Sequence, residues 1–216
     1  MNLSHNEKSF NVAFIPARGG SKGIPKKNLI LINNKPLIQY TIEAALKSNV
    51  SEVWVSSDDN DILEISNNIG AKTILRPDNI SLDNSSSELA LLHFANKIKF
   101  NKMIFLQATC PLTIPEDINQ CLEKLNNYDS VITVSETTQN IWFGNSPQYD
   151  IKNRKRRQEK KKIFLETGAI FGTYRDHLIK NKNRISGNVG FVEVPKKRSI
   201  DIDDYEDLYI VNKLLK

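Results

Sequence analysis

The sequence has no long apolar run and very little cysteine. None of its hydrophobic stretches approaches the roughly 20 residues that a membrane-spanning helix needs, and the mean hydropathy is −0.41. The polar stretch from Met1 to Ser9 has no apolar core of the kind that a secretory signal requires. Cys110 and Cys121 show no CxxC spacing and no nearby histidine cluster, which disfavours structural zinc and a disulfide framework. We therefore expect a soluble protein of the reducing cytoplasm, without a membrane partner.

Much of the excess positive charge lies in one stretch. The chain has 30 lysines and arginines against 25 aspartates and glutamates, for a formal net charge of +5. Residues 152–162 read "KNRKRRQEKKK". No aromatic side chain interrupts this run, although aromatic residues are the stacking platforms of proteins that bind single-stranded nucleic acid. Three interpretations stay open: a solvated arm, a nucleic-acid patch, which the missing aromatics disfavour, and a clamp for an anionic substrate.

Strand and helix signals alternate along much of the chain. Strands are expected at 10–15, 52–57, 71–75, 103–106 and 129–136, with a helical pattern after each of the first four. This alternation predicts a parallel sheet with helices on both faces and right-handed crossovers. From 137 to 162 the rhythm breaks, and strand signals return at 163–174 and 189–194 before a final amphipathic helix. We predict one domain, 1–216, with an inserted arm at about 137–165.

The first expected strand runs directly into "IPARGGSKGIPKKN", residues 15–28. A loop at the carboxyl end of a strand is where open α/β sheets hold their ligands. The spacing of its three glycines fits neither a Walker A loop nor a dinucleotide fingerprint. Glycines nevertheless let backbone N–H groups approach a phosphate closely, and cations neutralise its charge. The loop therefore predicts a phosphate-binding site whose cations are Arg18, Lys22 and Lys27.

A pair of aspartates near the end of the chain predicts a metal site. Asp201 and Asp203 stand two apart in "SIDID", which we read as the end of a strand, so both carboxylates would face the same side. Two carboxylates together with phosphate oxygens suit Mg²⁺. The acidic residues that follow also make a favourable first turn for the last helix, and we assign that role to Asp204, Glu206 and Asp207.

Taken together, these stretches resemble the cytidylyltransferases that activate nine-carbon acidic sugars, the CMP-sialic acid synthetase family. The resemblance is carried, in the family's order, by "IPARGGSKGIPKKN", "LRPDNISLDNSSS", "FLQATCPLT", "RRQ", "ETGAIF" and "SIDIDDYEDL". Related transferases for the eight-carbon acid Kdo also begin "IPAR" but lack the continuation. The resemblance implies a nucleotide-diphospho-sugar transferase-like fold, a three-layer α/β/α arrangement around a mostly parallel sheet. It also implies a homodimer in which the arm reaches the partner's site.

The same resemblance implies where CTP binds. Lys27 would lie nearest the reacting phosphorus, and Arg18 and Lys22 would share the catalytic charge neutralisation. An arginine beside the base has physical sense, because its planar donors fit the acceptor edge of cytosine. The matching aspartates of the family bind the metal, here Asp201 and Asp203. The implied nucleotide-binding set is Arg18, Gly19, Gly20, Ser21, Lys22, Lys27, Asn28, Arg76, Asp83 and Ser87.

The acidic sugar would be held by residues from two further stretches and the arm. Arg157 can meet a carboxylate in two parallel charge-assisted hydrogen bonds. The family commonly reads "QPTSPLR" where this chain has "QATCPLT", and Asn-Gly-Ala where it has Thr167 to Ala169. These departures surround the sugar and leave its identity open among sialic, legionaminic, pseudaminic and related acids. The implied substrate-binding set is Gln107, Arg157, Gln158, Thr167 and Gly168.

The expected reaction is attack of the sugar's anomeric hydroxyl on the α-phosphorus of CTP, with release of pyrophosphate. No histidine falls in a matching motif, so the general base stays open between a metal-bound water or hydroxide and one of Asp201 and Asp203. The alternatives are a transferase of the same fold for Kdo or a hexose phosphate, a glycosyltransferase that consumes the activated sugar, and a basic nucleic-acid-binding module.

Overall fold

A seven-stranded sheet forms the centre of the protein in the computed structural model, which describes residues 10–21 and 23–215. Its strand order is β11-β7-β10-β6-β1-β4-β5, and every neighbouring pair is parallel except the two that β10 makes. The mostly parallel sheet predicted from the sequence is thus confirmed. The strands are β1 (Val12–Pro16), β4 (Glu52–Ser57), β5 (Lys72–Leu75), β6 (Lys102–Leu106), β7 (Ser130–Thr137), β10 (Ile163–Tyr174) and β11 (Val189–Glu193).

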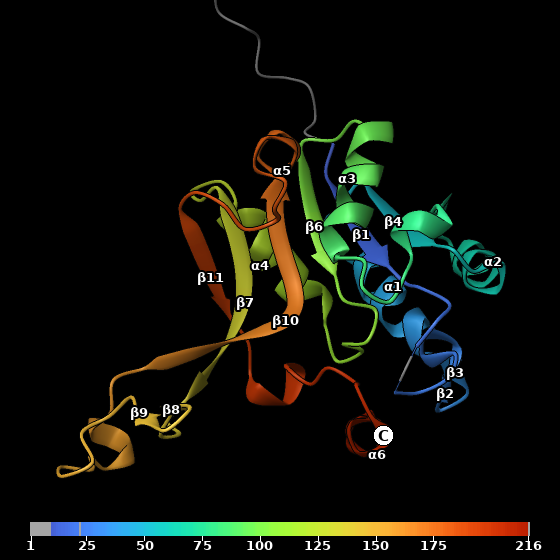
Figure 1. The fold of residues 1–216 in the computed structure, drawn as a ribbon. Helices are drawn as coiled ribbons and strands as arrows, with labels where there is room; N and C mark the ends of the chain where they lie inside the picture. The colour runs from blue at the N-terminus through green and yellow to red at the C-terminus, as the bar shows by residue number, and fades with distance from the viewer. Residues whose placement is uncertain (1–9, 22, 216) are drawn as a thin grey trace, which may run out of the picture.

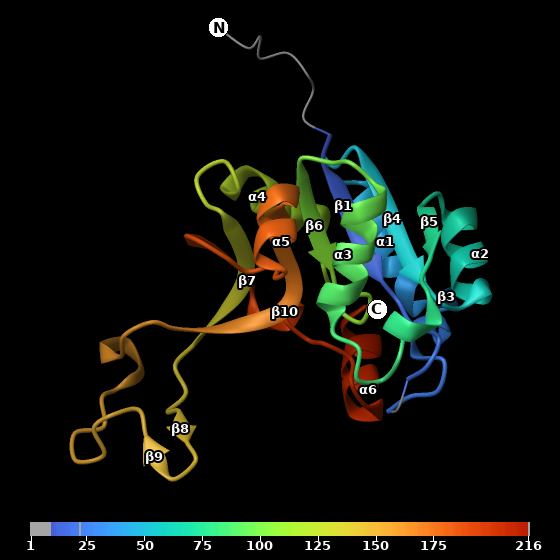
Figure 2. The same ribbon diagram turned by 45° about the horizontal axis from the view of Figure 1, so that its top comes forward.

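Helices cover both faces of this sheet (Figures 1 and 2). One face carries α1 (Leu37–Leu46), α2 (Asn60–Ile69) and α4 (Pro115–Lys124), and the other carries α3 (Ser87–Lys97) and α5 (Arg175–Asn181). Side chains of β1 alternate between two buried cores, because Ala13 and Ile15 belong to one and Val12 and Phe14 to the other. The predicted three-layer arrangement is confirmed. None of the helices that the structure describes is long and apolar enough to cross a membrane.

Local sequence signals explain where several helices begin and end. The Asp59 carboxylate accepts hydrogen bonds from the backbone N–H groups of Asp61 and Ile62, at 2.8 and 3.3 Å, and so caps the start of α2. Gly70 ends that helix at a φ of 109°. Pro115 occupies the first turn of α4, where its missing N–H costs no hydrogen bond.

The last helix, α6 (Tyr205–Leu214), lies across the end of the sheet toward which β1 and β6 run (Figure 1). Asp204 caps it, with its carboxylate accepting from the N–H groups of Glu206 and Asp207 at 2.9 and 3.0 Å. A third buried cluster joins α6 to the beginning of the chain. It consists of Ile24, Ile32, Leu37, Ile202 and Val211.

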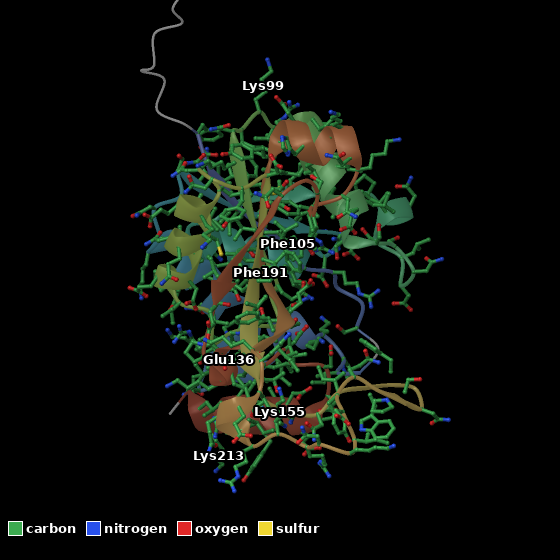
Figure 3. The ribbon with its side chains drawn as sticks, turned by 90° about the vertical axis from the view of Figure 1, so that its left-hand side faces the viewer. Lys99, Phe105, Glu136, Lys155, Phe191 and Lys213 are labelled. Atoms are coloured by element: carbon green, nitrogen blue, oxygen red, sulfur yellow. The ribbon has the colours of Figure 1, made fainter. Side chains whose placement is uncertain are left out.

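The residues between β7 and β10, 138–162, form an arm that projects away from the sheet (Figure 1). They contain only β8 (Trp142–Phe143), β9 (Ser146–Pro147) and the short 3-10 helix η3 (Arg157–Glu159). Without a helical crossover the chain returns antiparallel, which is why β10 reverses the direction of the sheet. Figure 3 shows Lys155 of the arm at the opposite end of the molecule from Lys99, which precedes β6.

Short elements surround the carboxyl end of the sheet. The hairpin of β2 (Leu31–Ile32) and β3 (Lys35–Pro36) follows the glycine-containing loop. The remaining 3-10 helices are η1 (Lys27–Leu29), η2 (Asp78–Ile80) and η4 (Lys196–Arg198).

One prediction about this end of the sheet is wrong: Asp201 and Asp203 do not lie on a strand. The segment 199–203 crosses the end of the sheet, where the Ile202 N–H donates to the carbonyl of Thr109 at 3.0 Å, instead of running beside a strand. The side chains of residues 201–203 still alternate in direction as they would on a strand, because Ile202 between the two aspartates is fully buried.

His93 on α3 provides a test of the packing on this face. Both ring nitrogens are buried without a hydrogen-bond partner in the described part of the chain, and burial lowers the pKa of the ring below 6.5, with Lys97 and Arg76 adding to the effect. A base with a depressed native pKa stays neutral in the folded state while it protonates in the unfolded state. We expect the His93 contribution to the free energy of unfolding to be present above pH 6.5 and to be lost as the pH falls below it.

The measurement is urea unfolding of the wild type and of His93→Gln between pH 7.5 and 5.5, as the difference between the two proteins at each pH. The wild type should lose more stability than the variant on acidification. Parallel losses in the two proteins would contradict the assignment.

Candidate active site

A cavity of about 320 Å³ lies at the carboxyl end of the sheet. Its walls come from the segments that follow β1, β5 and β6, three parallel strands of this half of the sheet, and from Asp203. Open α/β sheets bind ligands at this position. Most of the residues predicted for the nucleotide line it, together with one predicted for the sugar and one for the metal. They are Arg18, Ser21, Lys27, Asn28, Arg76, Asp83, Ser87, Gln107 and Asp203.

Asn28 holds the start of the loop after β1 in place. It is buried, and its side-chain amide donates to the backbone carbonyl of Arg18 at 3.0 Å. Its side-chain oxygen is buried without a hydrogen-bond partner among the described residues. Because a buried polar atom without a partner is costly, this oxygen is available to a donor group of a ligand.

Lys27 joins this loop to the segment that carries the two aspartates. Its ammonium group donates to the carbonyl of Ile202 and lies 3.3 Å from a carboxylate oxygen of Asp203. The Lys27 side chain is only 14% exposed, whereas that of Asp203 is 80% exposed. The predicted phosphate-binding lysine and a predicted metal ligand are therefore in contact at the edge of the cavity.

Two of the glycines are required by close contacts within the protein. A Cβ atom on Gly23 would lie 2.4 Å from the backbone oxygen of Asp203, and one on Gly19 would lie 2.6 Å from a carboxylate oxygen of Asp59. A Cβ on Gly20 would meet no atom within 4 Å, and Gly20 is exposed and does not line the cavity. From the sequence, the glycines were expected to let backbone N–H groups come close to a phosphate. The structure gives a further reason for Gly19 and Gly23, namely the tight packing of the loop against its neighbours.

Asp58 is a residue of the site that the sequence analysis did not assign to it. Its carboxylate accepts from the backbone N–H of Gly19 at 3.2 Å and from the guanidinium of Arg76 at 3.4 Å. Arg76 also donates to the Ser81 hydroxyl at 3.0 Å. The available signal was the pair of aspartates that ends the second strand: Asp59 takes the helix cap, which leaves Asp58 to face the loop.

Arg76 is one of the most buried cations of the site, with 6% of its surface exposed. Burial lowers the pKa of its guanidinium, and the neighbouring Asp58 partly offsets this. Its hydrogen bonds connect Ser81, in the loop before α3, with Asp58, which in turn binds the Gly19 N–H of the loop after β1. Arg76 therefore helps to shape the cavity, in addition to its predicted contact with the base.

Arg18 and Asp83 form an ion pair of 2.7 Å between two parts of the cavity lining. They were predicted to contact the phosphates and the nucleoside, respectively. An anionic ligand would therefore compete with the Asp83 carboxylate for Arg18. Lys22, which was predicted to share the phosphates, lies outside the described residues.

The two predicted metal ligands differ in their surroundings. Asp203 lines the cavity, whereas Asp201 has a carboxylate oxygen that is buried without a hydrogen-bond partner among the described residues. Burial raises the pKa of Asp201; Thr109 opposes this shift and the nearby Asp203 charge adds to it. A bound cation would relieve the cost of this buried carboxylate.

The donor set fits a cation that keeps water and phosphate oxygens as ligands. In the described part of the chain, no cluster of three or more histidine, cysteine, aspartate or glutamate side chains is arranged to hold a metal. Mg²⁺ is commonly bound by one or two carboxylates together with substrate phosphates and several waters, so Asp201 and Asp203 match it better than they match zinc.

The structure of a single subunit does not bring all the residues predicted for the sugar together at the cavity. Gln107 follows β6 and lines the cavity, and its backbone N–H donates to the carbonyl of Ala169 at 2.9 Å. Thr167 and Gly168 lie in an irregularity of β10, where the pairing with β7 shifts between Glu166 and Phe171. Gly168 adopts a φ of 71° there.

Thr167 is buried with its hydroxyl 2.6 Å from that of Thr133, and it does not line the cavity. This hydroxyl pair fixes the irregular part of β10, because the Thr133 hydroxyl also accepts from the backbone N–H of Ile170 at 3.2 Å. The segment that carries Thr167 and Gly168 therefore lies beside Gln107, and in this structure the Thr167 side chain holds the strand.

Arg157 and Gln158 lie in η3 of the arm, are exposed and do not line the cavity of their own chain. The arm encloses a separate hollow of about 270 Å³, which Tyr149, Lys155 and Lys160 help to line. The base of the arm is tied to β7 by an ion pair of 2.9 Å between Lys162 and Glu136. Glu136 is labelled in Figure 3.

Residues 12–206 match the cytidylyltransferase family. N-acylneuraminate cytidylyltransferase B of Danio rerio is 32% identical over 88% of this chain and 48% of its own length. The pseudaminic acid cytidylyltransferase of Campylobacter jejuni serotype O:2 is 34% identical over 95% of this chain and 96% of its own. The chain thus spans about half of the first relative and nearly all of the second.

Solved structures show the same fold. A CMP:2-keto-3-deoxy-manno-octonic acid synthetase complexed with CTP superposes with a TM-score of 0.76, at 23% identity, over 96% of this chain and 98% of its own. A 4-diphosphocytidyl-2C-methyl-D-erythritol synthase from Anaerococcus prevotii gives a TM-score of 0.71, at 12% identity, over 97% and 99%. The chain belongs to the cytidylyltransferase family.

The contact between Gly23 and the Asp203 backbone leads to a prediction about stability. Gly23→Ala would place a methyl group against a backbone oxygen, so we expect the free energy of unfolding to fall by about 1–3 kcal/mol, as for overpacking in a core. Gly20→Ala is the matched control, because its methyl group would enter open space. Urea denaturation of the two variants makes the comparison. Equal stability of the two would contradict the close approach of the loop to residue 203.

Proposed function

We propose that the protein joins CTP and a nine-carbon 2-keto sugar acid to give a CMP-sugar and pyrophosphate. The observation that carries the proposal is the cavity itself, in which the loop after β1, the residues before α3, Gln107 and Asp203 meet. The names of the relatives support the choice of reaction, since those relatives are N-acylneuraminate and pseudaminic acid cytidylyltransferases.

In this proposal the anomeric oxygen of the acid attacks the α-phosphorus of CTP. A new oxygen–phosphorus bond forms, and the bond from the α-phosphorus to the bridging oxygen of the β-phosphate breaks, so that pyrophosphate leaves. The protein contributes positioning and charge neutralisation, which dominate phosphoryl-type transfer. Lys27 and Ser21 face the phosphates. Arg18 leaves its ion pair with Asp83 and pairs with the phosphates instead. The nucleoside is surrounded by Asn28, Arg76, Asp83 and Ser87.

Asp201 and Asp203 would hold Mg²⁺. When bound, the cation would offset negative charge on the phosphates of CTP. Lys27, which contacts Asp203 in this structure, would then turn its ammonium group toward the phosphates.

Asp203 is the better placed of the two aspartates to accept the proton of the attacking hydroxyl. Its side chain is 80% exposed and lines the cavity, while one oxygen of Asp201 is buried. A carboxylate within hydrogen-bond reach of the reacting hydroxyl is a suitable general base. His93 and His177 are absent from the cavity lining given by the described residues, and His5 lies outside those residues.

The position of the arm supports a homodimer. Trp142 and Phe143 are 50% and 70% exposed, and Phe164, Leu165 and Phe191 lie exposed where the arm leaves the sheet. Exposed apolar patches of this kind mark interaction surfaces. We propose that the arm extends over a second subunit and brings Arg157 and Gln158 to the partner's cavity, where Arg157 would hold the carboxylate of the sugar acid.

The proposal includes a single domain over the whole chain and a location in the cytoplasm. The runner-up activity uses Kdo as the acid, and the fold of the CMP:2-keto-3-deoxy-manno-octonic acid synthetase is compatible with it. The "GGSKGIPKKN" continuation favours a nine-carbon acid. The direct test is pyrophosphate release from CTP and Mg²⁺ with sialic, legionaminic, pseudaminic and Kdo acids in turn, with the product confirmed by mass. Release with Kdo alone would select the runner-up.

Lys27 gives the sharpest test of the phosphate site. Lys27→Ala should lower kcat by about a hundredfold or more, because one well-placed electrostatic donor is worth roughly 3–4 kcal/mol in a transition state. Lys26→Ala is the matched control, since Lys26 is adjacent but points to Asp61 at the surface. The measurement is steady-state pyrophosphate release. Equal turnover of the two variants would rule out the role given to Lys27.

The sharing of sites between subunits can be tested by mixing two variants. We expect Arg157→Ala to raise the KM for the sugar acid and Lys27→Ala to inactivate the cavity. In a dimer of the two variants, one cavity has an intact Lys27 and receives an intact arm, so about a quarter of wild-type activity should return after subunits exchange at random. Activity of the mixture equal to the sum of the separate variants would contradict an arm that acts in trans.

A further inference from the structure

An ion pair between Arg198 and Asp117 lies outside the cavity. The guanidinium of Arg198 meets the carboxylate of Asp117 in two hydrogen bonds of 2.9 Å each, one from Nε and one from Nη2. Asp117 is 3% exposed. Two parallel bonds between guanidinium and carboxylate fix the geometry as well as the distance.

The pair connects two segments that lead into the site. Arg198 ends η4 and stands three residues before Asp201, while Asp117 lies in the first turn of α4, the helix that follows the segment 107–113. That segment provides Gln107 and Thr109 to the cavity. The Ile202 N–H is bonded to the Thr109 carbonyl, so residues 198–202 are attached to the 107–117 stretch at both ends.

These attachments determine where the Asp201 carboxylate lies. One of its oxygens is buried and has no hydrogen-bond partner within the described ranges, so no hydrogen bond of its own fixes that oxygen. On the other side of the segment, the close packing of Gly23 against the Asp203 backbone prevents movement toward the loop. Loss of the Arg198 anchor would release the segment on its open side.

We propose that Arg198 and Asp117 are positioning residues for the cation site, which hold the Asp201 and Asp203 carboxylates at the edge of the cavity. The proposal rests on the proposed function, in that the two aspartates bind a divalent cation together with CTP. Neither Arg198 nor Asp117 lines the cavity, so both act through the backbone they fix.

The experiment measures the binding of CTP by calorimetry, with and without Mg²⁺, in the absence of any sugar acid. The ratio of the two dissociation constants reports how strongly the protein couples metal to nucleotide. We expect Arg198→Lys and Asp117→Asn to reduce this ratio by about tenfold or more, as other residues that support metal ligands do. The affinity for CTP without metal should stay close to that of the wild type.

Arg184→Lys is the matched control. Arg184 also forms a half-buried ion pair of 2.9 Å, with Glu88 on α3, but the pair is not connected to the 198–203 segment. We expect this variant to lose thermal stability and to keep the wild-type ratio. Arg198→Lys preserves the charge of its residue, and Asp117→Asn preserves the shape of its residue. Thermal unfolding of both variants shows whether either has a folding defect.

An unchanged ratio in both test variants, with a loss of stability like that of Arg184→Lys, would overturn the proposal and leave the pair a purely structural contact. Wild-type protein that binds CTP equally with and without Mg²⁺ would overturn it through the metal site itself. If the wild-type protein does not bind CTP, the proposed function itself is contradicted. The failure of the positioning role can therefore be distinguished from the failure of the proposed function.

Discussion

The site depends on the close packing of the loop after β1 against the 201–203 segment. Gly23 allows the two backbones to approach, Lys27 bonds to the Ile202 carbonyl, and Ile24 and Ile202 are buried together beneath them. Chain segments nearly 180 residues apart in sequence thereby place the Lys27 ammonium group and the Asp203 carboxylate together at one edge of the cavity. Because opposite charges are already gathered there, the proposed binding of a nucleotide and a metal would require little rearrangement of the backbone.

The second feature is an exchange of ion pairs. Arg18 is paired with Asp83, and Lys27 contacts Asp203. A bound triphosphate and cation would take over these partners: the phosphates replace carboxylates at the two basic residues, and the cation replaces Lys27 at Asp203. Asp58 keeps its own role, since it holds the Gly19 N–H and the Arg76 guanidinium together. In this account the contacts of Asp58 stay fixed, whereas the side chains of Arg18 and Lys27 change partners when the ligands bind.

Much of the fold could be predicted from the sequence, because its periodicity is local. Short apolar runs, which are largely buried in the structure, located β1, β4 and β7, and Asp59 and Pro115 located helix starts. The reversal of β10 was not predicted from the residues, although its signal was present: no crossover helix is indicated in 138–162, and the chain returns antiparallel. The sequence also did not reveal that Asp201 to Asp203 lie outside a strand. An apolar Ile202 between two aspartates gives the same pattern in a strand and in an irregular segment that crosses the end of a sheet. Asp58 and the inward-facing Thr167 depend on contacts with distant residues, which no local pattern records.

The most direct test of this account is a crystal structure with CTP and Mn²⁺, in which anomalous scattering locates the metal. The account predicts a triphosphate beside Ser21 and Lys27, a nucleoside near Asn28 and Ser87, and a metal peak bonded to Asp201 or Asp203 and to a phosphate oxygen. It also predicts that the Arg18 contact with Asp83 is broken. A nucleotide bound outside this cavity, or a metal held by other residues, would contradict the assignment of the site.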